Sequence, residues 1–220
     1  MSNRIEKILV IEDNHTEALY AQTALGSAGF NEVEVAPNLS MGLKELPNYH
    51  AVLTDLFFPA GEISTEQYSQ RFLPFYERFK QSRFPRQNGG IVLAAVRTVA
   101  ETFGMAPQGY VENVVAKLNT PPVVLRAARD AVAGIKDSDR YQAFLKIEEG
   151  IRNGTNLPLG IIVCEEAGKL GMPSVIVTSA HHHSDAFGPV SSLIQVPYRD
   201  DLVDGKKDWK GGIEILLREE

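Results

Sequence analysis

The sequence predicts an α/β protein whose parallel sheet is interrupted by a helical insertion, and three observations lead to this prediction. Short apolar segments at residues 7–11 and 49–56 are typical of strands buried on both faces. Segments with helical spacing alternate with such strands at both ends of the chain. Residues 60–156 have almost no strand pattern. We therefore assign residues 1–59 and 157–220 to one α/β domain, and 60–156 to an inserted all-helical subdomain.

The first domain segment predicts alternating strands and helices. In order, the expected elements are a strand at 7–11, a helix at 15–29, a strand at 32–36, a short helix at 39–46 and a strand at 49–56. Glycines stand where the first helix should end, and Pro47 stops the second. Short connections between alternating elements favour a parallel, right-handed arrangement.

The middle segment predicts four or five helices separated by proline and glycine. The expected helices cover residues 65–81, 91–103, 110–118, 123–135 and 139–151. This insertion follows the strand at 49–56 directly, where a loop of about 2–6 residues would usually suffice. It could serve as a lid, a partner-docking surface or a dimerisation element.

The α/β pattern returns near residue 159. A helix at 159–170, a strand at 174–178, a last strand at 192–196 and a final helix at about 207–217 are expected. With the first segment, this gives five strands in one parallel sheet.

Composition narrows the classes of function. The 220 residues carry a net charge of −6, which argues against nucleic-acid binding through charge alone. The polar N-terminus is unlike a signal peptide, and no apolar stretch approaches ~18 residues. We expect a soluble, cytoplasmic protein. The single cysteine, Cys164, excludes an intramolecular disulfide and fits a buried core thiol.

Three of the predicted strands end in groups suited to phosphoryl chemistry. The first ends in Glu12 and Asp13, the third contains Asp55 near its end, and the fourth ends in Ser179. Parallel sheets bind ligands beyond the carboxyl ends of their strands. Three carboxylates there would repel one another, and Mg²⁺ would relieve that repulsion. Asp55 could then act as a carboxylate nucleophile, and Ser179 could hydrogen-bond a phosphate oxygen.

These segments resemble receiver domains of two-component signalling. The resemblance is carried by Ile8-Leu9-Val10-Ile11-Glu12-Asp13-Asn14 and by Ala51-Val52-Leu53-Thr54-Asp55-Leu56-Phe57-Phe58-Pro59. Weaker similarity follows at residues 159–180 and 196–202. It covers roughly residues 5–59 and 157–217. The resemblance implies a flavodoxin-like, doubly wound sheet of five parallel strands.

The resemblance also implies roles for individual residues. Glu12 and Asp13 match the acidic pair that holds Mg²⁺, and Asp55 matches the phosphoryl acceptor. The backbone carbonyl of Phe57 matches a further metal ligand. Ser179 matches the hydroxyl residue that contacts the phosphoryl group and switches with it.

The sequence departs from the family in the last third. A lysine is expected before the proline that follows the fifth strand, but Val196 occupies that position. Lys206, Lys207 or a cation from the insertion could substitute. Leu193 stands at the aromatic switch position, and little room remains for a full fourth helix between Ser179 and Val196.

Structural interpretations compete with the functional ones at each site. An aspartate at a strand end can simply cap the next helix, and a serine can do the same. The run His181-His182-His183 fits a solvent-exposed loop better than a metal or phosphate contact, because consecutive side chains point in different directions.

We interpret the chain as an atypical stand-alone response regulator, a signalling protein and not an enzyme. Its expected partners are a sensor histidine kinase or phosphotransfer protein, and a downstream protein that docks through residues 60–156. No nucleic-acid or membrane partner is expected, and a homodimer is left open. The alternatives are a pseudo-receiver interaction module that is not phosphorylated, and an Mg²⁺-dependent phosphatase or phosphotransferase with an aspartyl nucleophile.

Overall fold

A five-stranded, all-parallel sheet forms the centre of the α/β domain. The computed structural model describes residues 5–83, 139–182 and 184–218. The strands lie in the order β2-β1-β3-β4-β5, which is the order of flavodoxin-like doubly wound sheets. The prediction of an α/β fold with five parallel strands is confirmed, and the arrangement is consistent with the flavodoxin-like class.

Strands and helices alternate along the chain much as the sequence predicts. The first part contains β1 (Lys7–Ile11), α1 (His15–Ser27), β2 (Glu32–Ala36), α2 (Leu39–Glu45), the 3-10 helix η1 (Leu46–Asn48) and β3 (Ala51–Thr54). Two helices follow, α3 (Glu66–Arg83) and α7 (Asp139–Arg152). The last part contains α8 (Gly160–Lys169), β4 (Ser174–Val177), the 3-10 helix η2 (Ser191–Leu193), β5 (Tyr198–Arg199), β6 (Leu202–Val203), β7 (Lys206–Lys207) and α9 (Trp209–Leu216).

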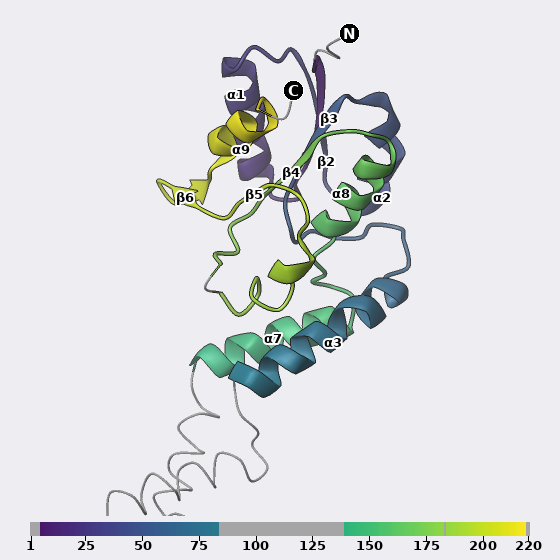
Figure 1. Ribbon diagram of the computed structural model, residues 1–220, viewed down its shortest axis with the longest axis vertical. Helices are drawn as coiled ribbons and strands as arrows, with labels where there is room; N and C mark the ends of the chain where they lie inside the picture. The colour runs from purple at the N-terminus through teal and green to yellow at the C-terminus, as the bar shows by residue number, and fades with distance from the viewer. Residues whose placement is uncertain (1–4, 84–138, 183, 219–220) are drawn as a thin grey trace, which may run out of the picture. The chain divides into compact units, whose positions relative to one another are not determined.

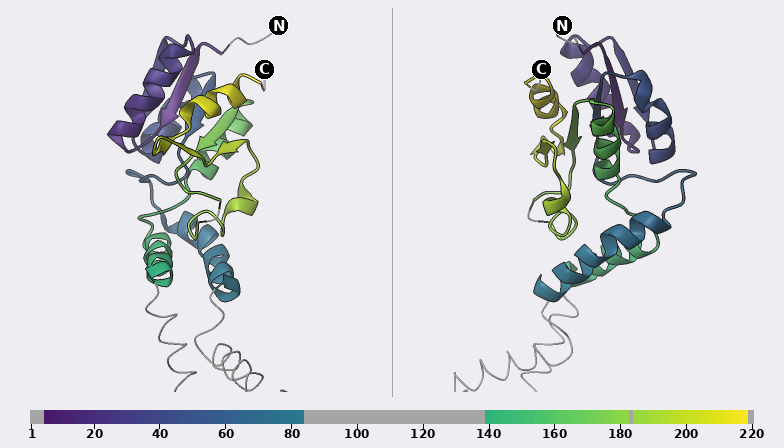
Figure 2. Two further views of the ribbon diagram at one scale, coloured as in Figure 1. Left: turned by 90° about the vertical axis from the view of Figure 1, so that its left-hand side faces the viewer. Right: turned by 45° about the vertical axis from the view of Figure 1, so that its right-hand side comes forward.

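Helices cover both faces of the sheet. Helices α1 and α9 lie on one face, and α2 and α8 lie on the other (Figure 1). The right-hand view of Figure 2 shows α9 and α8 on opposite sides of β4. The residues of β3 and β4 are buried throughout, and only Lys7 of β1 is partly exposed. This burial on both faces explains why these strands read as continuous apolar runs.

Local contacts position helices α1 and α2 beside the end of β1. The side chain of Asn14 accepts hydrogen bonds from the backbone N–H groups of Thr16 and Glu17, and so caps α1. Gly42 brings α2 close to β1, since a Cβ at this position would lie 2.5 Å from Cδ1 of Ile11. Both contacts hold the end of β1 in a defined place.

The last strand differs from its prediction. Residues 192–196 were expected to form it, but 191–193 form η2 and the strand that pairs with β4 is the two-residue β5. Pro197 precedes this strand, and its carbonyl accepts the N–H of Ile176. The described residues between β4 and β5 contain η2 and no α-helix.

An antiparallel hairpin that was not predicted follows β5. Strands β6 and β7 pair with each other and form a sheet of their own. Their two-residue turn is Asp204-Gly205, with φ of 52° and 76°. Positive φ at both positions is typical of a type I′ turn, for which Asp-Gly is a preferred sequence.

The chain divides into two compact units, one of Met1–Tyr76 with Ile147–Glu220 and one of Glu77–Lys146. Within the second, Phe79 stacks on Phe144 with ring centroids 5.8 Å apart. The predicted helices at 65–81 and 139–151 match α3 and α7. Those predicted at 91–103, 110–118 and 123–135 lie outside the described residues.

In the part of the chain that is described, every helix is too short or too polar to cross a bilayer.

Candidate functional site

The pairing of β1 with β3 brings two acidic residues to the same edge of the sheet. Ile11 lies beside Thr54 in the parallel register. The N–H of Asp55 donates to the carbonyl of Ile11 over 2.9 Å. Glu12 and Asp55 therefore leave the sheet as neighbours, as the sequence predicts for the ends of adjacent parallel strands.

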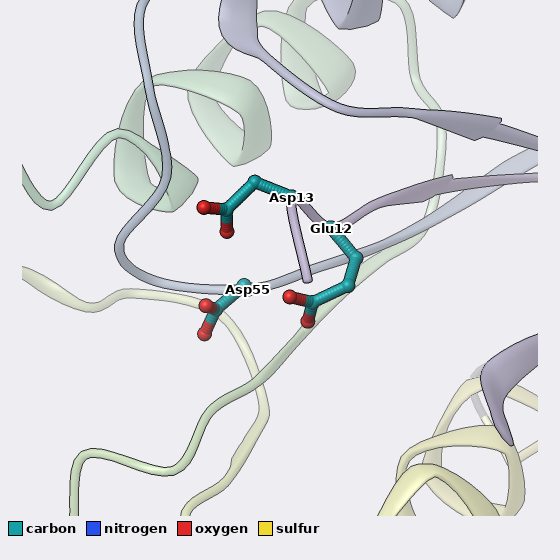
Figure 3. Close-up of side chains that lie close together, drawn as sticks. All are labelled: Glu12, Asp13 and Asp55. Atoms are coloured by element: carbon teal, nitrogen blue, oxygen red, sulfur yellow. The ribbon is translucent and has the colours of Figure 1, made fainter. Parts of the chain in front are cut away.

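Three carboxylates gather at this edge. One oxygen from each of Glu12, Asp13 and Asp55 lies within 4.8 Å of the others, and Figure 3 shows the three side chains close together. Asp13 is exposed, whereas Glu12 and Asp55 are only 2% and 6% exposed. Burying two carboxylates is costly unless a cation or hydrogen-bond donors compensate them.

Lys207 of β7 supplies that cation. Its ammonium lies 2.7 Å from Oδ2 of Asp55 and also contacts Oε2 of Glu12. The lysine side chain is 5% exposed, so the ion pairs are shielded from water and from screening by salt. The cation that the sequence lacks at Val196 is therefore present at Lys207, eleven positions later in the chain.

One ammonium between two buried carboxylates leaves an excess of negative charge. Burial and the neighbouring Asp55 raise the pKa of Glu12 to about 7, although Lys207 opposes the shift. Burial also raises the pKa of Asp55, again against the effect of Lys207. For Lys207, burial acts to lower the pKa, but the two carboxylates outweigh it and the pKa is raised. The lysine therefore stays charged, and Glu12 exchanges its proton near neutral pH.

Backbone donors fix the other carboxylate oxygens. Oδ1 of Asp55 accepts the N–H of Leu56 over 2.7 Å. Oε1 of Glu12 accepts the N–H of Asn14 over 2.9 Å. In both residues the second oxygen, Oδ2 or Oε2, faces Lys207. Oδ1 of Asp55 is thus held by the backbone, whereas Oδ2 faces the lysine side chain.

Thr178 places a hydroxyl group beside Asp55. Thr178 is buried directly after β4, and its side chain hydrogen-bonds the Asp55 carboxylate, which acts to lower the pKa of Asp55. Ser179 is exposed. The strand ends at Val177, so the first hydroxyl after it takes the inward position. The phosphoryl-contact role of Ser179 stays a prediction, and Thr178 supplies a hydroxyl contact to Asp55 in this structure.

A glycine permits helix α8 to start against the end of β3. A Cβ on Gly160 would lie 2.2 Å from the carbonyl oxygen of Asp55 and 3.0 Å from Cα of Leu56. The Gly160 N–H donates to the carbonyl of Leu56 over 3.1 Å. The absence of a side chain at residue 160 therefore lets α8 begin directly against the backbone of Asp55 and Leu56.

The remaining predicted residues lie around this site. Phe57 is partly buried in the bend after β3, and the role of its carbonyl as a metal ligand stays a prediction. His182 is exposed, and its Nδ1 lies 2.8 Å from Oδ2 of Asp200. Its ring stacks on that of His181. Residue 183 lies outside the described residues.

No family model, curated protein or solved structure matches this chain. The interpretation of the site therefore depends on the residues and their geometry.

The sequence named Lys207 as one of several possible substitutes for the lysine expected at Val196, but it did not single this residue out as the partner of Asp55. The signal that could have found it is Asp204-Gly205, which predicts a two-residue hairpin turn and so a short strand carrying Lys206 and Lys207. Thr178 was missed because the expected strand extended one residue too far, to 178.

The donor set fits a hard divalent cation. Carboxylate oxygens are the ligands that Mg²⁺ prefers, and one exposed carboxylate, Asp13, leaves an approach from solvent. Glu12 and Asp55 could join it once the ammonium of Lys207 shifts. The arrangement combines the buried carboxylate of Asp55 with the ammonium of Lys207 and the hydroxyl group of Thr178.

Proposed function

We propose that this chain is an atypical stand-alone response regulator of the cytoplasm, which accepts a phosphoryl group on Asp55 with the help of Mg²⁺. The expected donors are a sensor histidine kinase or a phosphotransfer protein. Residues 60–156 form, in this proposal, an inserted helical subdomain that contacts a downstream protein. The resemblance to receiver domains and the strand order β2-β1-β3-β4-β5 both support the proposal.

The observation that carries the proposal is the contact between Lys207 and Asp55. The sequence resemblance leaves the acceptor without its lysine, because Val196 stands at the expected position. The ammonium of Lys207 lies 2.7 Å from Oδ2 of Asp55. A cation at this distance can stabilise the negative charge that a phosphoryl group brings to the acceptor. Together with Thr178, it supplies the two contacts that a phosphorylated Asp55 would need.

The chemical step is an in-line displacement at phosphorus. Oδ2 of Asp55 forms the new P–O bond as the bond between phosphorus and the donor breaks, and the leaving group takes the electron pair. Lys207 and Thr178 lie beside the oxygens of the transferred group. Mg²⁺ bound by Glu12, Asp13 and Asp55 would neutralise charge on that group.

The test is phosphorylation by a small donor. Wild-type protein and Asp55→Asn are incubated with acetyl phosphate, with and without Mg²⁺, and intact masses are measured. We expect one added phosphoryl group in the wild type, only with Mg²⁺, and none in the variant. Asp208→Asn is a matched control, since this aspartate caps α9 and lies outside the carboxylate cluster. Equal modification of wild type and Asp55→Asn would refute the assignment.

The burial of Asp55 favours a second candidate, a pseudo-receiver that binds partners without phosphorylation. The residue is 6% exposed, and Lys207 already compensates its charge. In this function the ion pairs only stabilise the fold. Replacing Glu12, Asp55 and Lys207 together by apolar residues would then preserve both the fold and partner binding, whereas a working acceptor would lose its response to acetyl phosphate.

A further inference from the structure

The hairpin that carries Lys207 is short and separate from the main sheet. Strands β6 and β7 have two residues each and form no pairs with the five-stranded sheet. A two-stranded hairpin of this size is not stable alone. Side-chain contacts to the domain therefore contribute to its stability, and the two lysines of β7 provide two of them.

The two lysines contact different parts of the domain. Lys207 reaches Glu12 and Asp55 in the site. The ammonium of Lys206 lies 3.5 Å from the centroid of the Tyr20 ring on α1. Adjacent residues of a strand point to opposite faces, so Lys207 contacts the acidic site and Lys206 contacts the surface of α1. Figure 1 shows the hairpin on the same side of the sheet as α1 and α9.

The partner strand of the hairpin carries an apolar pair on the protein surface. Leu202 lies opposite Lys207, and Val203 lies opposite Lys206. The two apolar side chains are 51% and 54% exposed. The exposed apolar side chains are therefore on a strand that lies about 5 Å from the strand with the buried lysine.

Occupation of the site has to disturb the Lys207 contacts. Oδ2 of Asp55 is the oxygen left free by the backbone, and the ammonium already lies 2.7 Å away from it. A phosphoryl group bonded to Oδ2 would remove the carboxylate charge and occupy space beside this contact. A divalent cation would draw on the same oxygens of Glu12 and Asp55. Lys207 then has to leave its present position at Oδ2 of Asp55, turn toward the oxygens of the phosphoryl group and share Glu12 with the divalent cation.

We propose that the β6–β7 hairpin is the element that reports occupation of the acidic site at the surface: the Lys207 ion pairs are a latch, and ligand at Asp55 loosens it and alters the presentation of Leu202 and Val203. This inference rests on the proposed function, because it needs a site that takes up Mg²⁺ and a phosphoryl group. It adds an output element, formed by residues 202–207, to that function.

The experiment compares binding and hairpin stability in the same samples. Beryllofluoride with Mg²⁺ serves as the phosphoryl mimic, and its binding is followed by fluorine NMR. Amide hydrogen exchange of residues 202–207 is followed by mass spectrometry. In the wild type we expect binding together with roughly tenfold faster exchange in the hairpin, the size of effect that loss of one charged contact gives. Exchange in β1 and β3 stays unchanged.

Two adjacent lysines provide the matched variants. Lys207→Met is expected to show fast hairpin exchange without ligand and no further response to it. Lys206→Met removes the Tyr20 contact but should keep the response. Glu12→Gln, which retains the Asp55 contact, serves as a milder variant if Lys207→Met does not fold, and its unliganded exchange should be intermediate.

The failures are distinguishable. Binding of beryllofluoride with hairpin exchange that is unchanged or slower would overturn the latch and leave the proposed function standing. No binding of beryllofluoride in the presence of Mg²⁺ would overturn both. A response to ligand that persists in Lys207→Met would also overturn the latch.

Discussion

The two halves of the sheet are built differently, and they contribute different groups to the site. In the first half, β1 pairs with β2 over five residues and with β3 over four. In the second half, β4 pairs with β5 over only two residues, and a separate hairpin follows. The first half supplies the carboxylates of Glu12 and Asp55. The second half supplies Thr178 and Lys207.

In the proposed function, this difference divides the site into fixed and responsive groups. The carboxylates come from strands with full hydrogen-bonded register, and backbone donors hold one oxygen of each. The groups that face them come from a strand end and from a short hairpin. A site built in this way can keep its acceptor in place while the cation moves. The following predictions test whether the two groups of residues differ in this way.

The largest effect is expected for Lys207→Met. Removing the ammonium leaves Glu12 and Asp55 buried without a cation, and breaking a buried ion pair in this way costs about 3 kcal/mol. The free energy of unfolding, measured with urea at pH 8, should fall by about 3 kcal/mol. At pH 5 the loss should be smaller, because protonated carboxyls need no cation. Lys206→Met, on the same strand, should cost less than about 1 kcal/mol; equal losses would contradict the account.

The second effect is steric and is confined to helix α8. Gly160→Ala puts a methyl group 2.2 Å from the carbonyl oxygen of Asp55, so the helix start or the acceptor must shift. We expect about 2 kcal/mol of destabilisation. Gly168→Ala in the same helix meets no atom within 4 Å and should stabilise by about 0.5–1 kcal/mol. Thermal unfolding of both variants checks the pair, and a neutral Gly160→Ala would show that the close approach is not needed.

The third effect is a dependence of stability on pH. The folded protein holds the Glu12 proton more tightly than the unfolded chain, because burial raises the pKa from 4.5 to about 7. The folded state therefore binds more protons between these values. The contribution of Glu12 to the free energy of unfolding is largest below pH 4.5 and is lost as pH rises through 7. Urea unfolding across this range should show a smaller slope for Glu12→Gln; identical slopes would exclude Glu12 as the titrating group.

The smallest effect separates two adjacent hydroxyl groups. Thr178→Val removes the hydrogen bond to Asp55 and should weaken the binding of beryllofluoride by about 1 kcal/mol, or roughly fivefold in Kd. Ser179→Ala changes an exposed side chain and should change the Kd less than twofold. A larger effect of Ser179→Ala would restore the assignment that the sequence pattern first gave.

The first half of the fold could be predicted closely from the sequence, and the physical reason is its burial. Strands enclosed on both faces need apolar residues at nearly every position, so 7–11 and 51–54 stand out in the sequence. The edge strand at 32–36 stands out by its alternation of exposed glutamates with more buried valines. Because neighbouring parallel strands end at the same edge of a sheet, the sequence also predicts that Glu12 and Asp55 lie close together. Their proximity follows from the order of the strands in the sheet.

The second half could not be predicted in the same way. Strand β5 has two residues, too few for a recognisable pattern, and residues 192–196 gave an apolar signal without forming a strand. The partner of Asp55 is 152 positions away in the chain, at Lys207. Such a contact depends on where a hairpin docks, which local propensity does not determine. The choice between Thr178 and Ser179 depended on a single position at a strand end.

The central claim is that Asp55 is a working phosphoryl acceptor, and fluorine NMR of beryllofluoride binding tests it most directly. The account predicts a bound resonance in the wild type that requires Mg²⁺ and disappears in Asp55→Asn. Wild-type spectra that lack this resonance, or that match those of Asp55→Asn, would contradict it and leave the carboxylates and Lys207 with a purely structural role.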